Sequence, residues 1–565
     1  MTRRLIVLAA LSCGAAWAAS PEALHAQHGM VVSRSMLASQ AGADILARGG
    51  NAIDAAVATG FALAVTYPSA GNLGGGGFMV ISLADGTVIA NDHREVAPSA
   101  AHRDMYLDDD GNVDKALSRS STLAVGVPGT VDGLLGVLEK YGTMKRRDVI
   151  EPARRLAQDG FALNWDIVVQ LQRLKGALAK HPATAAIFTK DGGDFAPGER
   201  LRQPDLAQTL GRIIKDGRAG FYAGETADLI VAQMQRGGGI ITHEDLHSYT
   251  SVWREPARGN YRGHEIVSMP PPSSGGVLLI EMLNMLEPFD VGGLGYGSAA
   301  AVHLMIEAER RAYADRAEHL GDPDFYPVPV DMLVDKRYAR QRFADFKMGA
   351  ATKSDTVSAG AWPVESTETT HVSVVDKAGN AVAYTTTLNG MYGVKMVVGG
   401  AGFLLNNEMD DFSAKENAPN MYNLVGREAN SIAPRKRMLS SMAPTIVLKD
   451  GKPLLVTGSP GGSTIITTVL QVIVNVVDHG MDLTDAVGSP RFHHQWRPDR
   501  VFVEPQGFSP DTTALLQAMG HENIRSRASM YGFRRGIGEA NSIMVLDDGI
   551  LGVADPRVAG GAAGY

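Results

Sequence analysis

The residues best suited to covalent chemistry lie in a threonine-rich segment, ESTETTHVSVVDKAGNAVAYTTTLN, which spans residues 365–389. A threonine hydroxyl in mid-chain is a weak nucleophile when no base lies beside it. Thr369 can, however, attack the carbonyl carbon of Glu368 and form an ester by an N-to-O acyl shift. Hydrolysis of that ester leaves Thr369 as a new N-terminus. Its free α-amine, with an ordinary pKa of about 7.7–8.0, is then a general base for its own hydroxyl.

The element that must position this threonine is a predicted β-hairpin. THVSVVD alternates polar and apolar residues, residues 376–380 supply the turn, and AVAYTTT continues as the partner strand. A turn centred on Ala378 places Thr369 opposite Thr387, with Asn389 just beyond, and cross-strand neighbours lie about 5 Å apart. Taken alone, the segment is equally compatible with a half-exposed hairpin in which threonine serves β-propensity.

Helical patterns fill much of the chain before this hairpin. Alanine-rich periodicity predicts a buried helix from Asn51 to Val65, preceded by a Gly-Gly turn. Residues 128–286 are mainly helical in pattern, and residues 303–320 predict a long amphipathic helix. The apolar run 464–477 contains Thr, Gln and Asn and is interpreted as a buried helix rather than a membrane span.

Residues 349–368 lack periodicity and are interpreted as a loop or linker. The change of character near residue 368 is the clearest boundary in the chain. We therefore expect an α/β fold, with short strands at 372–376, 381–387, 445–449, 454–457 and 542–546.

Composition narrows the classes of function. The chain has 565 residues, 45% of them hydrophobic, and a net charge of −8 with acids and bases interspersed. The absence of a basic run argues against nucleic-acid binding. No segment offers about 20 uninterrupted apolar residues, so we expect no membrane span.

The first 18 residues, MTRRLIVLAALSCGAAWA, have the pattern of a secretory signal peptide: two arginines, an apolar run and a small-x-small cleavage site. The only cysteine, Cys13, lies within it, so cleavage after Ala18 leaves a mature chain without thiols. We expect export to the periplasm of a bacterium. Secretion to the medium, or lipid anchoring through the weak ALSC lipobox, is an alternative.

Two other signals are set aside. The glycine run GNLGGGGF lacks the Gly-Lys-Ser/Thr of a phosphate-binding loop and is interpreted as close backbone packing. His493 and His494 would point to opposite faces of a strand and chelate poorly, so we expect no metal site and no cofactor.

The segment from Thr369 resembles the start of the small subunit of γ-glutamyltranspeptidases, also called glutathione hydrolases. Further matches include GGNAIDAAVATGFALAVTYPSAGNLGGGGFMV, HREVAP, GVPGTVDGL and MPPPSSGG before it, and LLNNEMDDFS, RKRMLSSMAPTIV, VTGSPGGSTIITTVLQ and PRFHHQW after it. The resemblance covers nearly the whole chain from about residue 30. It implies an N-terminal nucleophile hydrolase with a four-layer αββα sandwich. It also implies a signal peptide 1–18, a large subunit 19–368 and a small catalytic subunit 369–565, formed by autocatalytic cleavage between Glu368 and Thr369.

The resemblance also assigns roles in catalysis. Thr369 matches the nucleophile, and Thr387 matches the hydroxyl that orients it. Gly461 and Gly462 match the pair whose backbone N–H groups form the oxyanion hole. Tyr422 matches a tyrosine on a lid loop that some family members lack.

The remaining matched residues bind the α-amino acid end of the substrate. Arg94 matches the arginine that holds the α-carboxylate, for which its planar fork is suited. Asp411 matches the acid that pairs with the α-ammonium. Four further residues complete the binding site in the family: Asn389 and Glu408 beside the ammonium, and Ser440 and Ser441 at the carboxylate. Glu408 stands where bacterial relatives often carry glutamine, and either residue can accept from an ammonium.

The activity implied by the resemblance is transfer of a γ-glutamyl group. The donor is glutathione or another γ-glutamyl compound, and the acceptor is water, an amino acid or a dipeptide. One alternative is an acylase of the same fold that takes a different acyl group, such as a cephalosporin or glutaryl acylase. Another is a periplasmic binding protein that is never cleaved.

Overall fold

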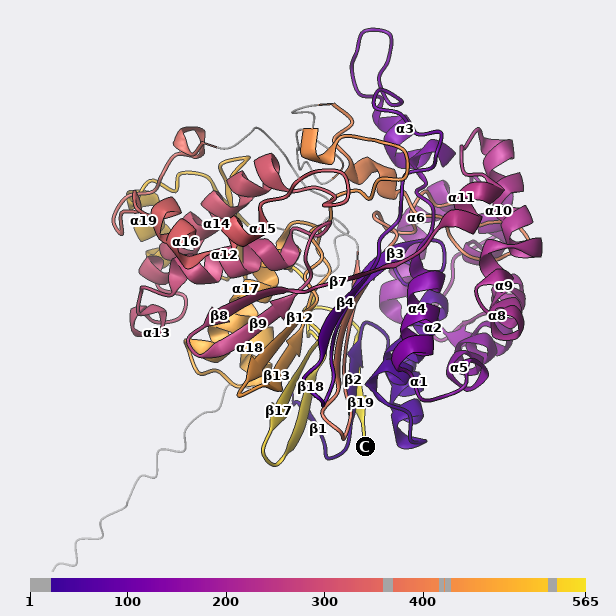
Figure 1. Cartoon of the computed structure of the whole chain (residues 1–565), viewed down its shortest axis with the longest axis horizontal. Helices are drawn as coiled ribbons and strands as arrows, with labels where there is room; N and C mark the ends of the chain where they lie inside the picture. The colour runs from indigo at the N-terminus through magenta and orange to yellow at the C-terminus, as the bar shows by residue number, and fades with distance from the viewer. Residues whose placement is uncertain (1–21, 359–368, 416–420, 422–427, 527–535) are drawn as a thin grey trace, which may run out of the picture.

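The computed structural model describes residues 22–358, 369–415, 421, 428–526 and 536–565. The predicted signal peptide 1–18, Glu368 and Tyr422 lie outside these residues. Among the described residues, two antiparallel seven-stranded sheets are stacked face to face between two layers of helices (Figure 1). The expected four-layer αββα architecture is therefore confirmed.

One sheet carries the predicted hairpin at its centre, in the order β19-β2-β10-β11-β3-β4-β7. This sheet contains strands from both sides of residue 368. The change of sequence character at that residue therefore does not separate two domains. The strands are β19 (Gly561–Gly564), β2 (Met30–Ser33), β10 (Thr370–Val375), β11 (Ala381–Thr387), β3 (Gly76–Ser82), β4 (Val88–His93) and β7 (Val252–Arg254).

The second sheet has the order β1-β18-β17-β13-β12-β9-β8 and also mixes the two halves of the chain. Its strands β12 and β13 pack against β11 of the first sheet. The strands are β1 (Leu24–Ala26), β18 (Gly549–Val553), β17 (Ser542–Leu546), β13 (Lys452–Thr457), β12 (Thr445–Lys449), β9 (His264–Ser268) and β8 (Ala257–Tyr261).

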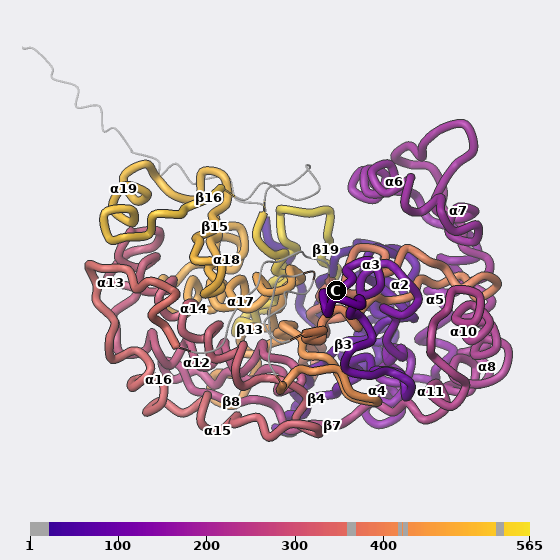
Figure 2. Tube along the Cα trace, turned by 90° about the horizontal axis from the view of Figure 1, so that it is seen from above, coloured from indigo at the N-terminus to yellow at the C-terminus, as the bar shows by residue number. Residues whose placement is uncertain are grey.

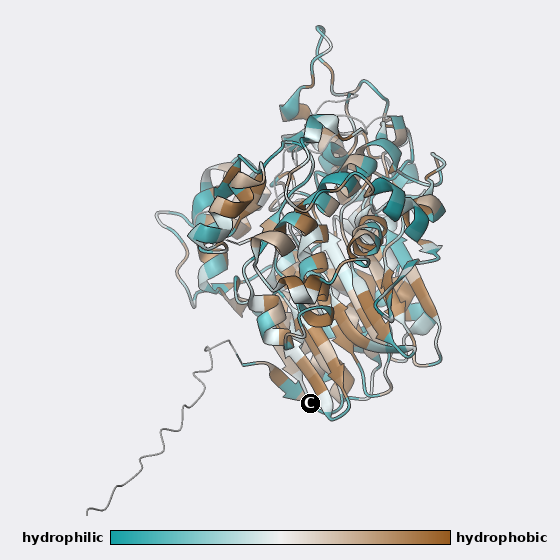
Figure 3. Ribbon diagram, turned by 90° about the vertical axis from the view of Figure 1, so that its left-hand side faces the viewer, coloured by the Kyte–Doolittle hydropathy of each residue, from teal (hydrophilic) through white to brown (hydrophobic). Residues whose placement is uncertain are grey.

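Helices cover the outer face of each sheet, and apolar residues gather on the strands and on the helix faces turned toward them (Figure 3). The first sheet is covered by α1 (Met36–Ala47), α2 (Ala52–Thr66) and α4 (Thr130–Tyr141), backed by α5 (Arg146–Asp159), α8 (Pro204–Asp216) and α10 (Gly224–Gly237). The second is covered by α12 (Gly275–Leu286), α17 (Thr464–Val477) and α18 (Leu483–Gly488), and α14 (Ala299–His319) and α16 (Lys336–Arg342) pack against α12. The helices α6 (Trp165–Leu178) and α7 (Pro182–Phe188) project at one end, and α19 (Pro510–Ala518) lies at the other (Figure 2).

The helix α2 confirms the prediction for residues 51–65. Asn51 caps it, since its side chain accepts from the backbone N–H of Ile53 and Asp54 at 3.0 Å, and Asp54 accepts in return from the Asn51 N–H at 2.9 Å. All its residues are buried, because it lies between β10, β11 and the outer helices.

The register of the hairpin is also as predicted. Thr370 pairs with Thr386 and Val375 with Ala381. The preceding residue, Thr369, therefore lies opposite Thr387 at the open end. The strands expected near 445, 454 and 542 are present as β12, β13 and β17.

The prediction that residues 128–286 are mainly helical is confirmed, because α4 to α12 fill most of this region. The region also contains strands that the sequence did not predict, among them β7, β8 and β9, and β8 and β9 extend the second sheet. These strands alternate polar and apolar residues only weakly, so their pairing with β12 decides their conformation. Within the described residues, no helix has both the length and the apolarity needed to cross a membrane.

The structure supports the interpretation of the glycine run GNLGGGGF as a site of close backbone packing. A Cβ on Gly75 would lie 2.1 Å from the Thr387 carbonyl oxygen and 2.8 Å from the Asn72 side chain. The backbone of this loop thus packs directly against the end of β11, where only glycine fits.

We expect Gly75→Ala to push the end of β11 away and to lower the free energy of unfolding by about 1–3 kcal/mol, as overpacking does elsewhere. Urea unfolding measures this change. Gly211→Ala is the matched control, because nothing lies within 4 Å of its added methyl group and alanine favours the helix. Equal stability of the two variants would contradict the packing argument.

Candidate active site

Thr369 immediately precedes β10 and is only 5% exposed. Across the sheet, Thr387 ends β11 and pairs with Gly76 of β3. The hydroxyl oxygen of Thr387 accepts from the backbone N–H of Asn389 at 2.8 Å, and Asn389 has a left-handed backbone with φ of 68°. The turn after β11 therefore holds the Thr387 side chain at the end of the hairpin where Thr369 begins.

Gly461 and Gly462 lie in the loop that leads into α17. Their φ angles of 136° and 57° are in the region that favours glycine. A Cβ on Gly461 would lie 2.3 Å from the Thr464 hydroxyl oxygen. The loop ends at the N-terminus of α17, a 14-residue helix whose dipole favours negative charge there. This is a suitable environment for a developing oxyanion.

Arg94 follows β4 and is fully buried. Its terminal nitrogens donate to Glu408 and to Asp411, the latter at 2.5 Å, and its Nε donates to the Met438 carbonyl at 3.2 Å. Glu95 lies 3.7 Å from the same guanidinium. One cation thus faces three carboxyl groups.

Burial raises the pKa of all three carboxyl groups, and the positive charge of Arg94 opposes that rise. The pKa of Glu95 is about 7 and that of Asp411 about 8, and the pKa of Glu408 is raised well above its ordinary value. The pKa of Arg94 is raised as well: burial lowers it, but Glu408 and Asp411 more than offset that effect. The cluster therefore has capacity for a second cation.

The expected ammonium-binding residues also carry unsatisfied acceptors. Asn389 is tied to the residue before Glu408, because its Nδ2 donates to the Asn407 carbonyl at 2.8 Å. Among the described residues, Asn389 Oδ1 and Glu408 Oε2 are buried and accept no hydrogen bond from an N–H group, and the Glu408 carboxyl can share a proton only with that of Glu95. A buried acceptor without a donor is costly, so both atoms indicate a place for a donor from a ligand.

Ser440 and Ser441 lie in an extended segment that pairs with the loop at residues 272–274. Ser440 forms a parallel bridge with Ser273, and its N–H donates to the Pro272 carbonyl at 2.8 Å. The Ser441 hydroxyl accepts from Arg316 at 3.0 Å. The two serines are therefore fixed by contacts to the part of the chain that precedes residue 368.

A single pocket brings most of the predicted residues together. It is lined by Arg94, Arg316, Thr369, Thr387, Glu408, Asp411, Leu439, Ser440, Ser441, Met442, Gly462 and Ile465. Asn389 and Gly461 are absent from the lining but adjoin it through their contacts with Thr387 and with the start of α17. The predicted lid residue Tyr422 and the residue Glu368 before the nucleophile lie outside the described residues.

Sequence reasoning missed Arg316 as a pocket residue. It belongs to α14, where AERRAYADRAEH carries several charged residues at helical spacing. In the structure it is 4% exposed. Its burial alone distinguishes it from an ordinary surface arginine, and no signal in the sequence reveals that burial.

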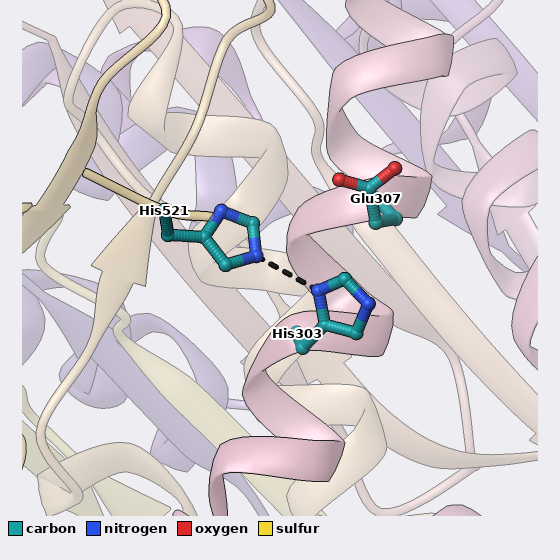
Figure 4. A group of neighbouring side chains, drawn as sticks. All are labelled: His303, Glu307 and His521. Carbon is teal, nitrogen blue, oxygen red and sulfur yellow. Dashed lines mark hydrogen bonds between the residues drawn. The ribbon is translucent and has the colours of Figure 1, made fainter. Parts of the chain in front are cut away.

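Two histidines and a glutamate beside the same helix have side chains of the kind that bind metal ions. His303 and Glu307 of α14 lie beside His521, which follows α19, with potential ligand atoms all within 4.8 Å (Figure 4). His303 Nε2 is 2.9 Å from the Lys347 carbonyl and must donate to it. His303 Nδ1 then accepts from His521 Nε2 at 2.8 Å.

The carboxylate of this cluster is already neutralised. Glu307 accepts from Arg311 at 2.7 Å, from Arg310 at 3.2 Å and from the Thr352 N–H at 3.1 Å. These contacts use the oxygens that a metal would need and place two positive charges beside them. The contacts favour a buried hydrogen-bonded cluster that braces α14 over a metal centre, and we assign no metal to it.

The stacked antiparallel sheets, with a buried threonine at the start of a central strand, define the class of N-terminal nucleophile hydrolases. The family model described as gamma-glutamyltranspeptidase matches residues 38–565. The chain belongs to this family, whose members are enzymes.

The chain is also similar to named relatives over most of its length. The chain is 51% identical over 537 residues to the glutathione hydrolase proenzyme of Escherichia coli (strain K12), covering 94% of this chain and 91% of the relative. It is 41% identical over 529 residues to the acylase ACY 1 proenzyme of Pseudomonas sp. (strain SE83), covering 93% and 91%.

Solved structures resemble the chain in two ways. The cephalosporin acylase from Bacillus halodurans superimposes with a TM-score of 0.83 at 26% identity and covers 99% of both chains. The γ-glutamyltranspeptidase of Helicobacter pylori has a TM-score of 0.57 at 48% identity, and its match covers 57% of this chain but 93% of that one. The fold is thus shared by transpeptidases and acylases.

Proposed function

We propose that the chain cuts itself between Glu368 and Thr369 and then transfers γ-glutamyl groups through an ester on Thr369. The observation that carries this proposal is the pocket. Thr369, Thr387 and Gly462 line it together with Arg94 and Asp411. A nucleophile, backbone N–H groups for an oxyanion and charged groups for a zwitterion thus line the same pocket.

The electrostatics support recognition of an α-amino acid end. Arg94 supplies the cation for a carboxylate. The surplus of buried acid around it, and the unsatisfied oxygens of Asn389 and Glu408, suit the three N–H donors of an α-ammonium. With Ser440 and Ser441 at the carboxylate, the γ-carbonyl of the substrate is directed toward Thr369.

The chemistry follows from this placement. The Thr369 hydroxyl attacks the γ-carbonyl carbon while the α-amine of Thr369 takes its proton. Backbone N–H groups of Gly461 and Gly462 stabilise the oxyanion. The C–N bond breaks as the ammonium of Thr369 protonates the leaving amine, which leaves a γ-glutamyl ester. Water then gives glutamate, and an amino acid or dipeptide gives a new γ-glutamyl compound.

Two observations support maturation into subunits 19–368 and 369–565. The relatives above are named proenzymes, and the Helicobacter pylori chain matches only about half of this chain while being almost fully covered itself. Because each sheet contains strands from both sides of residue 368, the two fragments would stay together as a heterodimer. We further propose a periplasmic location after loss of residues 1–18, and a lid role for Tyr422. The proposed reaction requires no cofactor.

The acylase relative makes transfer of another acyl group the competing function. A γ-glutamyl anilide and a glutaryl anilide, which lacks the α-amine, distinguish the two. Without the ammonium, Asp411 and Asn389 lose charge-assisted partners, so we expect the γ-glutamyl anilide to be preferred about 10- to 100-fold in kcat/KM. Equal turnover, or a preference for the glutaryl compound, would favour the acylase.

Thr369→Ala removes the hydroxyl group that attacks both in self-cleavage and in γ-glutamyl transfer. We expect a single uncleaved chain on a denaturing gel and turnover below about one thousandth of the parental rate. Thr369→Ser, which keeps a hydroxyl, is the matched variant and should still yield two fragments. Cleavage of the alanine variant at the same bond would show that Thr369 is not the attacking group.

Glu408→Gln tests the charge balance around Arg94. Burial is the main cause of the raised pKa of Asp411, but the negative charge of Glu408 also raises it. Asp411 must be ionised to bind the ammonium, and the α-amine of Thr369 must be unprotonated to act as the base, so kcat/KM should rise with pH as both groups lose a proton. Loss of the Glu408 charge should lower the pKa of Asp411 and so move the ascending limb to lower pH. Glu151→Gln, on the remote helix α5, should leave the limb in place, and a shift to higher pH in Glu408→Gln would contradict the account.

A further inference from the structure

Arg316 is a charged residue of the pocket lining to which the proposed reaction gives no role. It projects from α14, near the helix end, and is 4% exposed. Its Nε donates to the Ser274 hydroxyl at 2.9 Å and its terminal nitrogen to the Ser441 hydroxyl at 3.0 Å. One guanidinium thus joins a helix to two separate loops.

The two loops are also joined to each other beneath this arginine. The N–H and the hydroxyl of Ser274 both donate to the Ser440 carbonyl at 2.8 Å. The Ser273 hydroxyl donates to the Met442 carbonyl at 2.6 Å. The segment MPPPSSGG, which contains these two serines, therefore supports the backbone around Ser440 and Ser441.

A hydroxyl group has one hydrogen to donate and two acceptor positions. The Ser274 hydroxyl accepts from Arg316 and donates its one hydrogen to the Ser440 carbonyl. Ser441 accepts from the same guanidinium, which fixes its oxygen and leaves its hydrogen as the donor. Contact with a cation also polarises the O–H bond and strengthens it as a donor.

We propose that Arg316 is a positioning residue that sets substrate specificity: it orients the Ser441 hydroxyl, and through Ser274 the Ser440 segment, toward the carboxylate of the acyl substrate. This inference rests on the proposed function. Lysine could not replace it fully, because a single ammonium on a flexible stem does not reproduce the fork that spans both serines.

The same helix also contacts the loop that carries Gly461 and Gly462. The Tyr313 hydroxyl, one turn before Arg316, donates to the carbonyl of Ser463. Ser463 directly follows Gly462 and is the residue before α17. The helix α14 therefore fixes the distance between the carboxylate site and the oxyanion loop.

The test compares two substrates that differ only in the carboxylate: an L-γ-glutamyl anilide and a 4-aminobutanoyl anilide. For Arg316→Met we expect kcat/KM to fall about tenfold on the glutamyl substrate, mainly through KM, and less than about twofold on the substrate without a carboxylate. Arg316→Lys should recover part of the loss. In a Ser441→Ala background, the loss caused by Arg316→Met should largely disappear, because the two residues act as one unit.

Equal losses on both substrates, or full additivity with Ser441→Ala, would overturn the inference and leave Arg316 a structural residue. Arg311→Met is the control for loss of a buried arginine from the same helix, since Arg311 is absent from the pocket lining, and it should affect both substrates alike. Cleavage into two fragments verifies folding of each variant; if Arg316→Met fails to mature, Arg316→Lys carries the same substrate comparison. The proposed function fails separately, if the parental enzyme itself does not distinguish the two anilides.

Discussion

The antiparallel pairing of β10 with β11 is the constraint on which the rest of the site depends. It fixes Thr369 at the open end of a central hairpin, opposite Thr387, in a sheet whose neighbours β2 and β3 come from the first half of the chain. A slip of one residue would turn every side chain of β10 to the other face. The buried helix α2 and the stacked second sheet exclude such a slip, because both faces of β10 are already packed.

The buried charges around Arg94 are a second constraint on the pocket. A buried ion pair is only weak evidence for stability, since desolvation offsets attraction. In the proposed function, Arg94 with Glu95, Glu408 and Asp411 forms a binding site, in which a ligand that carries both charges completes the unbalanced cluster. The two serines are held from two sides: Arg316 of α14 and the loop 272–274 contact them directly, and Arg94 donates to the carbonyls of Met438 and Leu439 just before them.

How much of this could be predicted depended on how local each interaction is. The hairpin and its register follow from alternation and a turn within twenty residues, and α2 follows from its cap and its alanine pattern. The strands β8 and β9 were missed, because their conformation depends on pairing with β12, which is distant in sequence. Arg316 was missed for the same reason, since its contacts join a helix to two remote loops. The roles of Arg94, Asp411 and the glycine pair came from family resemblance rather than from spacing, and the structure adds that most of them share one pocket.

The central claim is that Thr369 becomes an N-terminus. N-terminal sequencing of the smaller fragment of the purified protein tests it directly. The account predicts that the fragment begins at Thr369 and reads TTHVSVV. A fragment that begins at Thr370 or elsewhere, or an active protein that remains one uncut chain, would contradict it.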